Sequence, residues 1–76
     1  MMADKTIVGR RILTLRKAAK LSQQQLARMI GCSLQNIGYY ERGEKFPSLP
    51  TAYNIAHALG ITLDQLVTPE KVVIEI

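Results

Sequence analysis

Apolar residues recur along the chain at spacings of three and four, which place side chains on one face of an α-helix. The stretches that show this spacing contain Val8, Ile12, Leu15 and Ala19; Leu26, Met29 and Ile30; Ile37 and Tyr40; Ala52, Ile55, Ala56 and Leu59; and Leu63, Leu66 and Val67. Gly31, Gly43 and Gly60 each follow such a stretch, where helices commonly end. The pattern predicts five helices.

The predicted helix starts carry side chains that can cap a helix. The segments 22–25 (SQQQ) and 62–65 (TLDQ) have the spacing of a capping box, in which two side chains and two backbone amides bond reciprocally. Ser33 can cap the third helix by accepting from an amide two or three residues later, and Ser48 is a weaker start for the fourth. Because each cap contributes about 1 kcal/mol, we expect the helix starts to be well defined.

The C-terminal segment 70–76 departs from the helical pattern. Val72, Ile74 and Ile76 alternate in a run dominated by β-branched residues, which predicts a short strand. A lone strand cannot satisfy its own amides. We therefore expect it to pair with the same segment of a second subunit or with residues near 5–7, or else to be a frayed tail.

The charge is unevenly distributed along a chain that is long enough for one domain. Its 76 residues predict a single unit over 1–76 with a core over 7–67. Ten Lys and Arg against six Asp and Glu give a net charge of +4, but residues 1–45 hold nine basic and three acidic residues, or +6. Such a basic region favours a polyanion as partner, although the same residues could simply solvate helix surfaces.

Several classes of protein are disfavoured by what the sequence lacks. The single cysteine, Cys32, rules out a disulfide framework and suits a reducing cytoplasm. No uncharged apolar run approaches the ~20 residues of a membrane helix. No phosphate-binding glycine loop, HExxH segment or convincing catalytic set occurs. We expect a cytoplasmic protein with no enzymatic activity, no cofactor, no metal and no membrane association.

The segment 22–43 carries the strongest functional signal. A short helix over about 22–30 ends at Gly31, and a brief turn leads into a second short helix over about 34–42. Two short helices joined by a glycine-containing turn of this length form a helix-turn-helix. In such units the second helix can enter the major groove of DNA, with its N-terminal residues against the base edges.

The side chains at the start of that second helix suit the reading of DNA. Gln35 can pair with an adenine edge, and Leu34 can touch a thymine methyl group. Ser33 and Asn36 can reach phosphate or base. The residue types therefore agree with the motif.

The order and spacing of residues over 7–67 resemble the Cro/CI-type helix-turn-helix regulators, also called lambda-repressor-like or XRE proteins. The resemblance is carried by LSQQQLA at 21–27, IGCS at 30–33, Ile37, YERG at 40–43, PSL at 47–49 and ALGI at 58–61. It implies an all-α, compact five-helix lambda-repressor-like domain, to which this chain adds the predicted strand. It also implies a homodimer that binds double-stranded DNA at a pseudo-palindromic operator.

The resemblance also implies roles for individual residues. Together with Ser33, the expected base contacts are Leu34, Gln35 and Tyr39. The expected phosphate contacts are the backbone-facing Gln23, Asn36, Arg42 and Lys45, joined by Arg10 near the start of the first helix. Arg16 and Glu41 match an ion pair between the first and third helices that supports the fold.

Two residues depart from the family pattern. Gly38 lies inside the recognition helix, where it should cost about 1 kcal/mol relative to alanine. It either lets the backbone approach DNA closely or removes one contact. Tyr39 stands where the family often has a basic or amide side chain, and its hydroxyl could donate to phosphate or its ring could pack on a sugar.

Other residues are interpreted as structural. We expect Cys32 and Tyr40 in the core, His57 at the surface or a dimer interface, and Arg11 and Lys17 on a solvated face. The function expected is that of a dimeric repressor reading the major groove with residues 33–42. The alternatives are an antitoxin or adaptor that binds a protein through 70–76, and a small activator of the kind that controls restriction-modification genes.

Overall fold

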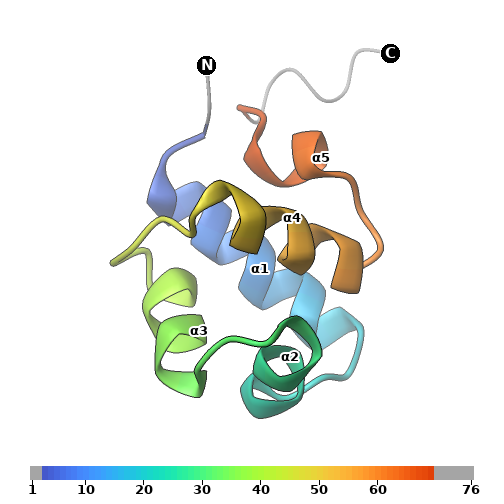
Figure 1. The fold of residues 1–76 in the computed structure, drawn as a ribbon. Helices are drawn as coiled ribbons and strands as arrows, with labels where there is room; N and C mark the ends of the chain where they lie inside the picture. Colours follow the sequence, from blue (N-terminus) through green and yellow to red (C-terminus); the bar gives the residue numbers. More distant parts are fainter. Residues whose placement is uncertain (1–2, 70–76) are drawn as a thin grey trace.

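The computed structural model describes residues 3–69, which form five helices joined by short loops (Figure 1). The helices are α1 (Lys5–Ala18), α2 (Gln23–Ile30), α3 (Leu34–Glu41), α4 (Leu49–Ala58) and α5 (Leu63–Val67). α1 packs against α3 and α5, and α2 packs against α3 and α4. The prediction of a compact five-helix domain is confirmed.

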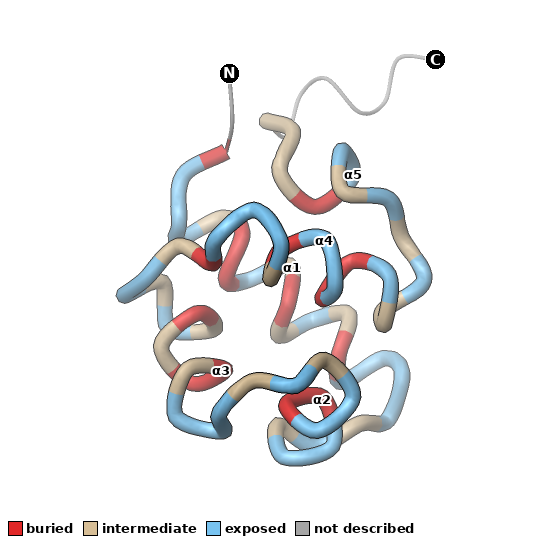
Figure 2. The backbone as a smooth tube through the Cα atoms, in the orientation of Figure 1, coloured by how far each residue is buried: buried red, intermediate tan, exposed pale blue. Residues whose placement is uncertain are grey.

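The core lies where the inward faces of the five helices meet (Figure 2). The largest fully buried side chains come from all five: Val8, Ile12, Leu26, Ile37, Ile55 and Leu66. Every one of them belongs to a predicted apolar stripe. Tyr40 is also buried, as expected, and the half-buried Cys32 packs against the cluster. Burial raises the pKa of the Cys32 thiol, which favours the neutral form and agrees with a packing role.

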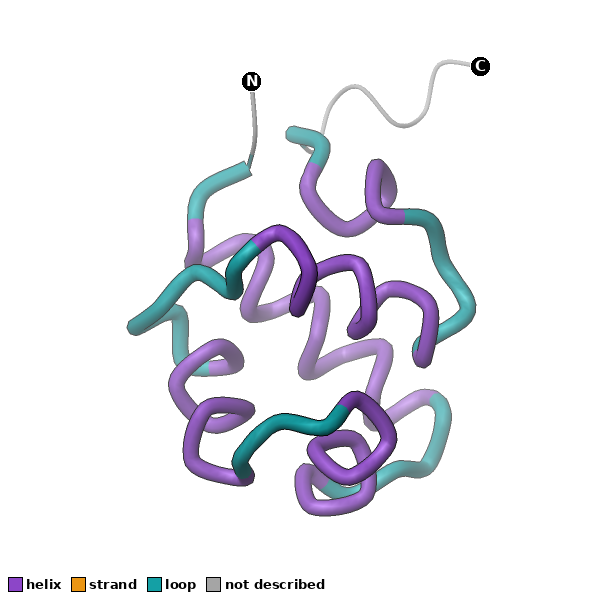
Figure 3. The backbone as a smooth tube through the Cα atoms, in the orientation of Figure 1, coloured by secondary structure: helices purple, strands orange, loops and turns teal. Residues whose placement is uncertain are grey.

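Each helix begins at a side chain that accepts a hydrogen bond from its first turn. Both predicted capping boxes, over 22–25 and 62–65, are complete, and Ser33 and Ser48 cap α3 and α4. Asp4 caps α1 in the same way, although the pattern did not predict it. Because these caps satisfy amides that the helix leaves unpaired, they fix where the helices in Figure 3 begin.

The ends of α2, α3 and α4 follow the predicted glycines, whereas α1 and α5 end without one. Gly31, Gly43 and Gly60 all have a positive φ, between 71° and 78°. α1 ends without glycine, because Lys20 adopts the left-handed conformation with φ 62°. The Leu21 amide then donates to the carbonyl of Arg16 at 3.1 Å, which closes the helix.

The two ends of the described chain lie side by side (Figure 1). The Ala3 amide donates to the carbonyl of Val67 at 2.7 Å. Arg11 reaches across from α1, and its Nη1 donates to three carbonyl oxygens at the end of α5, at 2.7 to 3.2 Å. The expectation that Arg11 lies on a solvated face was wrong, because the last turn of a helix leaves carbonyls that a guanidinium can satisfy.

The predicted strand over 70–76 lies outside the described residues. One partner considered for it is excluded by the structure, because residues 5–7 form the first turn of α1. A backbone in the helical conformation cannot pair along a strand. Pairing with residues 5–7 was therefore a wrong expectation, and its cause is the unpredicted Asp4 cap, which starts the helix at Lys5.

Candidate nucleic-acid interface

The helix-turn-helix is formed by α2, residues 31–33 and α3. Gly31 takes the left-handed conformation that ends α2, and the Cys32 amide bonds back to the carbonyl of Ala27 at 3.0 Å. Ser33 then caps α3 by accepting from the Asn36 amide at 3.0 Å. The two helices pack against each other, so the turn holds α3 in a fixed position.

α3 has one buried and one exposed face. Ile37, Gly38 and Tyr40 are buried against the rest of the domain. The expected base contacts lie on the other side, where Ser33, Leu34 and Gln35 are exposed and Tyr39 is half-buried. Of the expected phosphate contacts near α3, Asn36 is half-buried, and Arg42 and Lys45 are exposed.

Four of these residues form one polar surface, which we call the Tyr39 cluster: Gln35, Tyr39, Arg42 and Lys45. The Gln35 Nε2 donates to the Tyr39 Oη at 3.1 Å. The Arg42 guanidinium carbon and the Lys45 Nζ each lie 5.4 Å from the centroid of the Tyr39 ring, within range of a cation–π attraction. Residues predicted to contact bases and residues predicted to contact phosphates are thus brought together.

Arg42 also has an acidic partner that the sequence did not single out. Its Nε lies 3.0 Å from the Glu44 Oε2, and its Nη2 donates to Oε1 at 3.3 Å. This hydrogen-bonded pairing raises the pKa of Arg42 and lowers the pKa of Glu44. Because both side chains are more than half exposed, water screens this ion pair and it adds little stability.

Arg42 lies over Gly38 on the same helix. A Cβ atom on Gly38 would sit 2.9 Å from the Arg42 Nη1. The close approach of DNA to this backbone, considered from the sequence, would therefore require Arg42 to move. The space left by the glycine is occupied by the end of a flexible side chain.

The Arg16 and Glu41 side chains are buried and in contact between α1 and α3. The Arg16 Nε lies 2.6 Å from the Glu41 Oε2, and Nη2 donates to Oε1 at 3.1 Å. Arg16 also donates to the carbonyl of Leu21 at 2.8 Å, and Gln23 donates to Glu41 Oε1 at 2.9 Å. One amide proton of Gln23, an expected phosphate contact, is therefore already bound within the protein.

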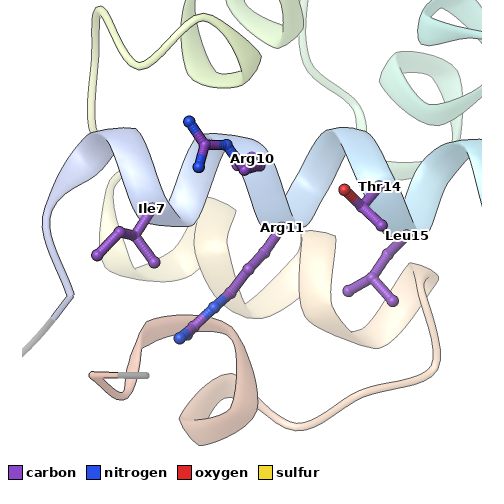
Figure 4. Close-up of a pocket in the computed structure, with 5 residues that line it drawn as sticks. All are labelled: Ile7, Arg10, Arg11, Thr14 and Leu15. Atoms are coloured by element: carbon purple, nitrogen blue, oxygen red, sulfur yellow. The ribbon is translucent and has the colours of Figure 1, made fainter. Parts of the chain in front are cut away.

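Arg10 comes from a separate part of the surface. It lines an open groove of about 350 Å³ along α1, together with Ile7, Arg11, Thr14 and Leu15. In Figure 4 the two arginine side chains point in different directions from α1, Arg11 toward α5 and Arg10 toward α3. Within residues 3–69, no hydrogen bond, ion pair or cation–π contact joins Arg10 to the Tyr39 cluster.

His57 is exposed on α4, where its ring stacks on that of Tyr53 with centroids 6.2 Å apart. In the part of the chain that the structure describes, no three His, Cys, Asp or Glu side chains are grouped as they would be to bind a metal ion. No helix of that part has the length and apolar character needed to cross a membrane.

The sequence matches the helix-turn-helix family over residues 12–66. It is 38% identical over 65 residues to the uncharacterized HTH-type transcriptional regulator YazB of Bacillus subtilis (strain 168), which covers 86% of this chain and 94% of that protein. Four other curated relatives are longer, and the chain spans 47% to 54% of their length.

Two solved structures share the fold and about a third of the sequence. The restriction-modification controller protein C.AhdI from Aeromonas hydrophila superposes with a TM-score of 0.77 and 35% identity, covering 82% of this chain and 94% of that one. The P22 c2 repressor protein, solved in complex with synthetic operator 9T in the presence of Tl+, has a TM-score of 0.76 and 33% identity, with coverages of 79% and 91%.

Proposed function

Because the chain belongs to the helix-turn-helix family, whose members similar to it are transcriptional regulators rather than enzymes, we propose that it regulates transcription by binding DNA. In this proposal α3 enters the major groove of double-stranded DNA, and residues 7–67 form the binding unit. The protein acts in the cytoplasm, where its single half-buried thiol stays reduced.

The observation that carries the proposal is the two-sided character of α3. Its inner face is anchored by Ile37 and Tyr40, while Leu34 and Gln35 at its N-terminal end are exposed. Arg42 follows at its C-terminal end, on the same surface as Gln35 through the Tyr39 cluster. A helix that is fixed on one side and offers polar and cationic groups on the other suits entry into a groove lined by phosphates.

The contacts that we propose are those predicted from the sequence. The side chains that face the bases are Ser33, Leu34, Gln35 and Tyr39. The phosphates are bound by Gln23, Asn36, Arg42, Lys45 and Arg10.

We further propose a homodimer that represses by occupying a pseudo-palindromic operator. The likeness to the P22 c2 repressor, whose structure contains a synthetic operator, supports this mode of binding. Two copies of α3 in successive major grooves would place the half-sites about 34 Å apart.

A second candidate outcome is activation. It is supported by the likeness to a restriction-modification controller protein, 94% of which the chain covers. Repression and activation can be distinguished by transcription with purified polymerase from a promoter that carries a DNA site bound by the protein. Added protein lowers the transcript level in repression and raises it in activation.

A third candidate, an antitoxin or adaptor, uses residues 70–76 to bind another protein. It rests on the alternation of Val72, Ile74 and Ile76 in the sequence. Removal of residues 70–76 should then abolish co-purification of a partner while DNA binding persists.

Selection of bound sequences from a random DNA pool tests the proposed function. We expect a two-fold symmetric site whose affinity falls steeply with salt. If three cations of each subunit bind phosphate, log K should fall against log salt with a slope of about −5 for the dimer. An affinity that does not depend on salt, or a pool without enriched sequence, would contradict the proposal.

Gln35→Ala should relax the preference at one base pair of each half-site. A bidentate contact to a base discriminates against the wrong base by about 1–3 kcal/mol. Gln24→Ala is the matched control, since it removes an exposed glutamine of α2 for which no contact with DNA is proposed. Unchanged preference in Gln35→Ala would remove this residue from base reading.

Glu44→Gln should raise the affinity for DNA. The change removes a negative charge beside the phosphates and frees Arg42 from its ion pair. We expect a gain of about two- to fivefold at moderate salt, in keeping with the small energies of exposed pairs. Asp64→Gln, on α5, removes an acidic charge without touching Arg42 and serves as the control. Equal effects of the two substitutions would mean that only net charge matters.

A further inference from the structure

The hydrogen bond between Gln35 and Tyr39 lies inside the surface that we propose to read DNA. The Gln35 Nε2 donates to the Tyr39 Oη at 3.1 Å, an ordinary length for such a bond. The two residues are four apart on α3, so their side chains are neighbours on one face. We infer that Tyr39 is a positioning residue that orients the Gln35 amide for base readout, an inference that rests on the proposed function.

The bond leaves Gln35 with the groups that an adenine edge requires. A glutamine amide has two N–H donors and a carbonyl acceptor, and the bond to Tyr39 uses one donor. The remaining N–H and the Oε1 can bond the adenine N7 and N6 groups, respectively. Tyr39 can therefore hold the Gln35 amide and leave free the two groups that would bond adenine.

Gln35 is exposed, so little else restricts its side chain. A free glutamine samples many rotamers and loses that freedom when it binds a base. A side chain that is already held by a hydrogen bond gives up less freedom, and only a base with which Gln35 forms its own hydrogen bonds gains from this. The bond therefore favours one base over the others as well as stronger binding.

Tyr39 is suited to this role because it is itself restrained. It is half-buried, and the cations of Arg42 and Lys45 lie 5.4 Å from its ring centroid. A tyrosine side chain has only two rotatable bonds before its hydroxyl, so holding it costs little conformational freedom. Phenylalanine at this position would keep the ring and both cations and remove only the hydroxyl.

The test compares wild type, Tyr39→Phe, Gln35→Ala and the double variant by selection from a random DNA pool, followed by titrations on the selected site and its single-base variants. We expect Tyr39→Phe to select the same half-site but to discriminate about two- to tenfold less at the base pair that Gln35→Ala relaxes. In the double variant, loss of the hydroxyl should add nothing at that base pair. The salt slope should not change, because all cations remain.

The matched control is Tyr53→Phe, which removes an exposed hydroxyl from α4, where the ring stacks on His57. Circular dichroism of each variant establishes that it is folded. The inference is overturned if Tyr39→Phe weakens binding to all sequences by the same factor, or if it behaves like Tyr53→Phe. A wild-type protein that selects no sequence would overturn the proposed function as well, whereas selective wild-type binding with unaltered preference in Tyr39→Phe overturns the inference alone.

Discussion

Glu41→Ala is expected to lower the free energy of unfolding by about 3–5 kcal/mol, a large part of the total stability of a domain of this size. The Glu41 side chain is 4% exposed and accepts from Arg16 at 2.6 and 3.1 Å and from Gln23 at 2.9 Å. Removal of the Glu41 carboxylate leaves the Arg16 guanidinium buried without a negatively charged partner. Urea unfolding followed by circular dichroism measures the loss.

Glu44→Ala is the control, because it removes the carboxylate of the exposed Arg42 pair instead of the buried one. It should unfold at the same urea concentration as wild type. The double substitution Arg16→Met, Glu41→Leu should recover much of the loss, since it removes both buried charges together. If Glu41→Ala unfolds at the same urea concentration as Glu44→Ala, the buried pair contributes no stability.

The contribution of this pair should not depend on pH near neutrality through Arg16. Its hydrogen bond to Glu41 raises the pKa of Arg16 above an already high ordinary value. A raised pKa in the folded state stabilises the protein below the unfolded value, and that stability is lost only as the pH rises through the folded value. The loss therefore falls in strongly alkaline solution.

The helix starts could be predicted from the sequence because their signals are local. A capping box such as that over 22–25 involves residues three apart, and its geometry depends on little else. The same holds for Gly31, whose left-handed conformation ends α2. The turn and the start of α3 follow from these two signals, so the motif itself was visible in the sequence.

Contacts between helices could not be predicted in this way. Arg11 bonds carbonyls 54 to 57 residues later in the chain, and nothing near Arg11 in the sequence indicates that partner. Within the candidate interface, the resemblance indicated which residues would face DNA but not how they bond one another. The signal for the Gln35–Tyr39 bond was available, because positions four apart on a helix are neighbours, but the sequence does not show which neighbours bond.

Gly9 has a structural role that the sequence analysis did not predict. It lies in the middle of α1, where a glycine normally weakens a helix, and it is buried. A Cβ atom there would lie 2.2 Å from the carbonyl oxygen of Tyr40 and 3.1 Å from that of Glu41. α1 and α3 therefore cross with their backbones nearly in contact, and only a residue without a side chain fits between them.

Gly9→Ala should accordingly destabilise the domain by about 3 kcal/mol or more, at or above the usual cost of overpacking, because backbone atoms cannot move aside as a side chain can. Gly38→Ala is the matched control on the other helix. Its Cβ would meet only the flexible end of Arg42, so the higher helix propensity of alanine should add up to about 1 kcal/mol. Thermal and urea unfolding compare the two. Equal stability of the two variants would show that α1 and α3 can separate at little cost, and that the close crossing does not fix the position of α3.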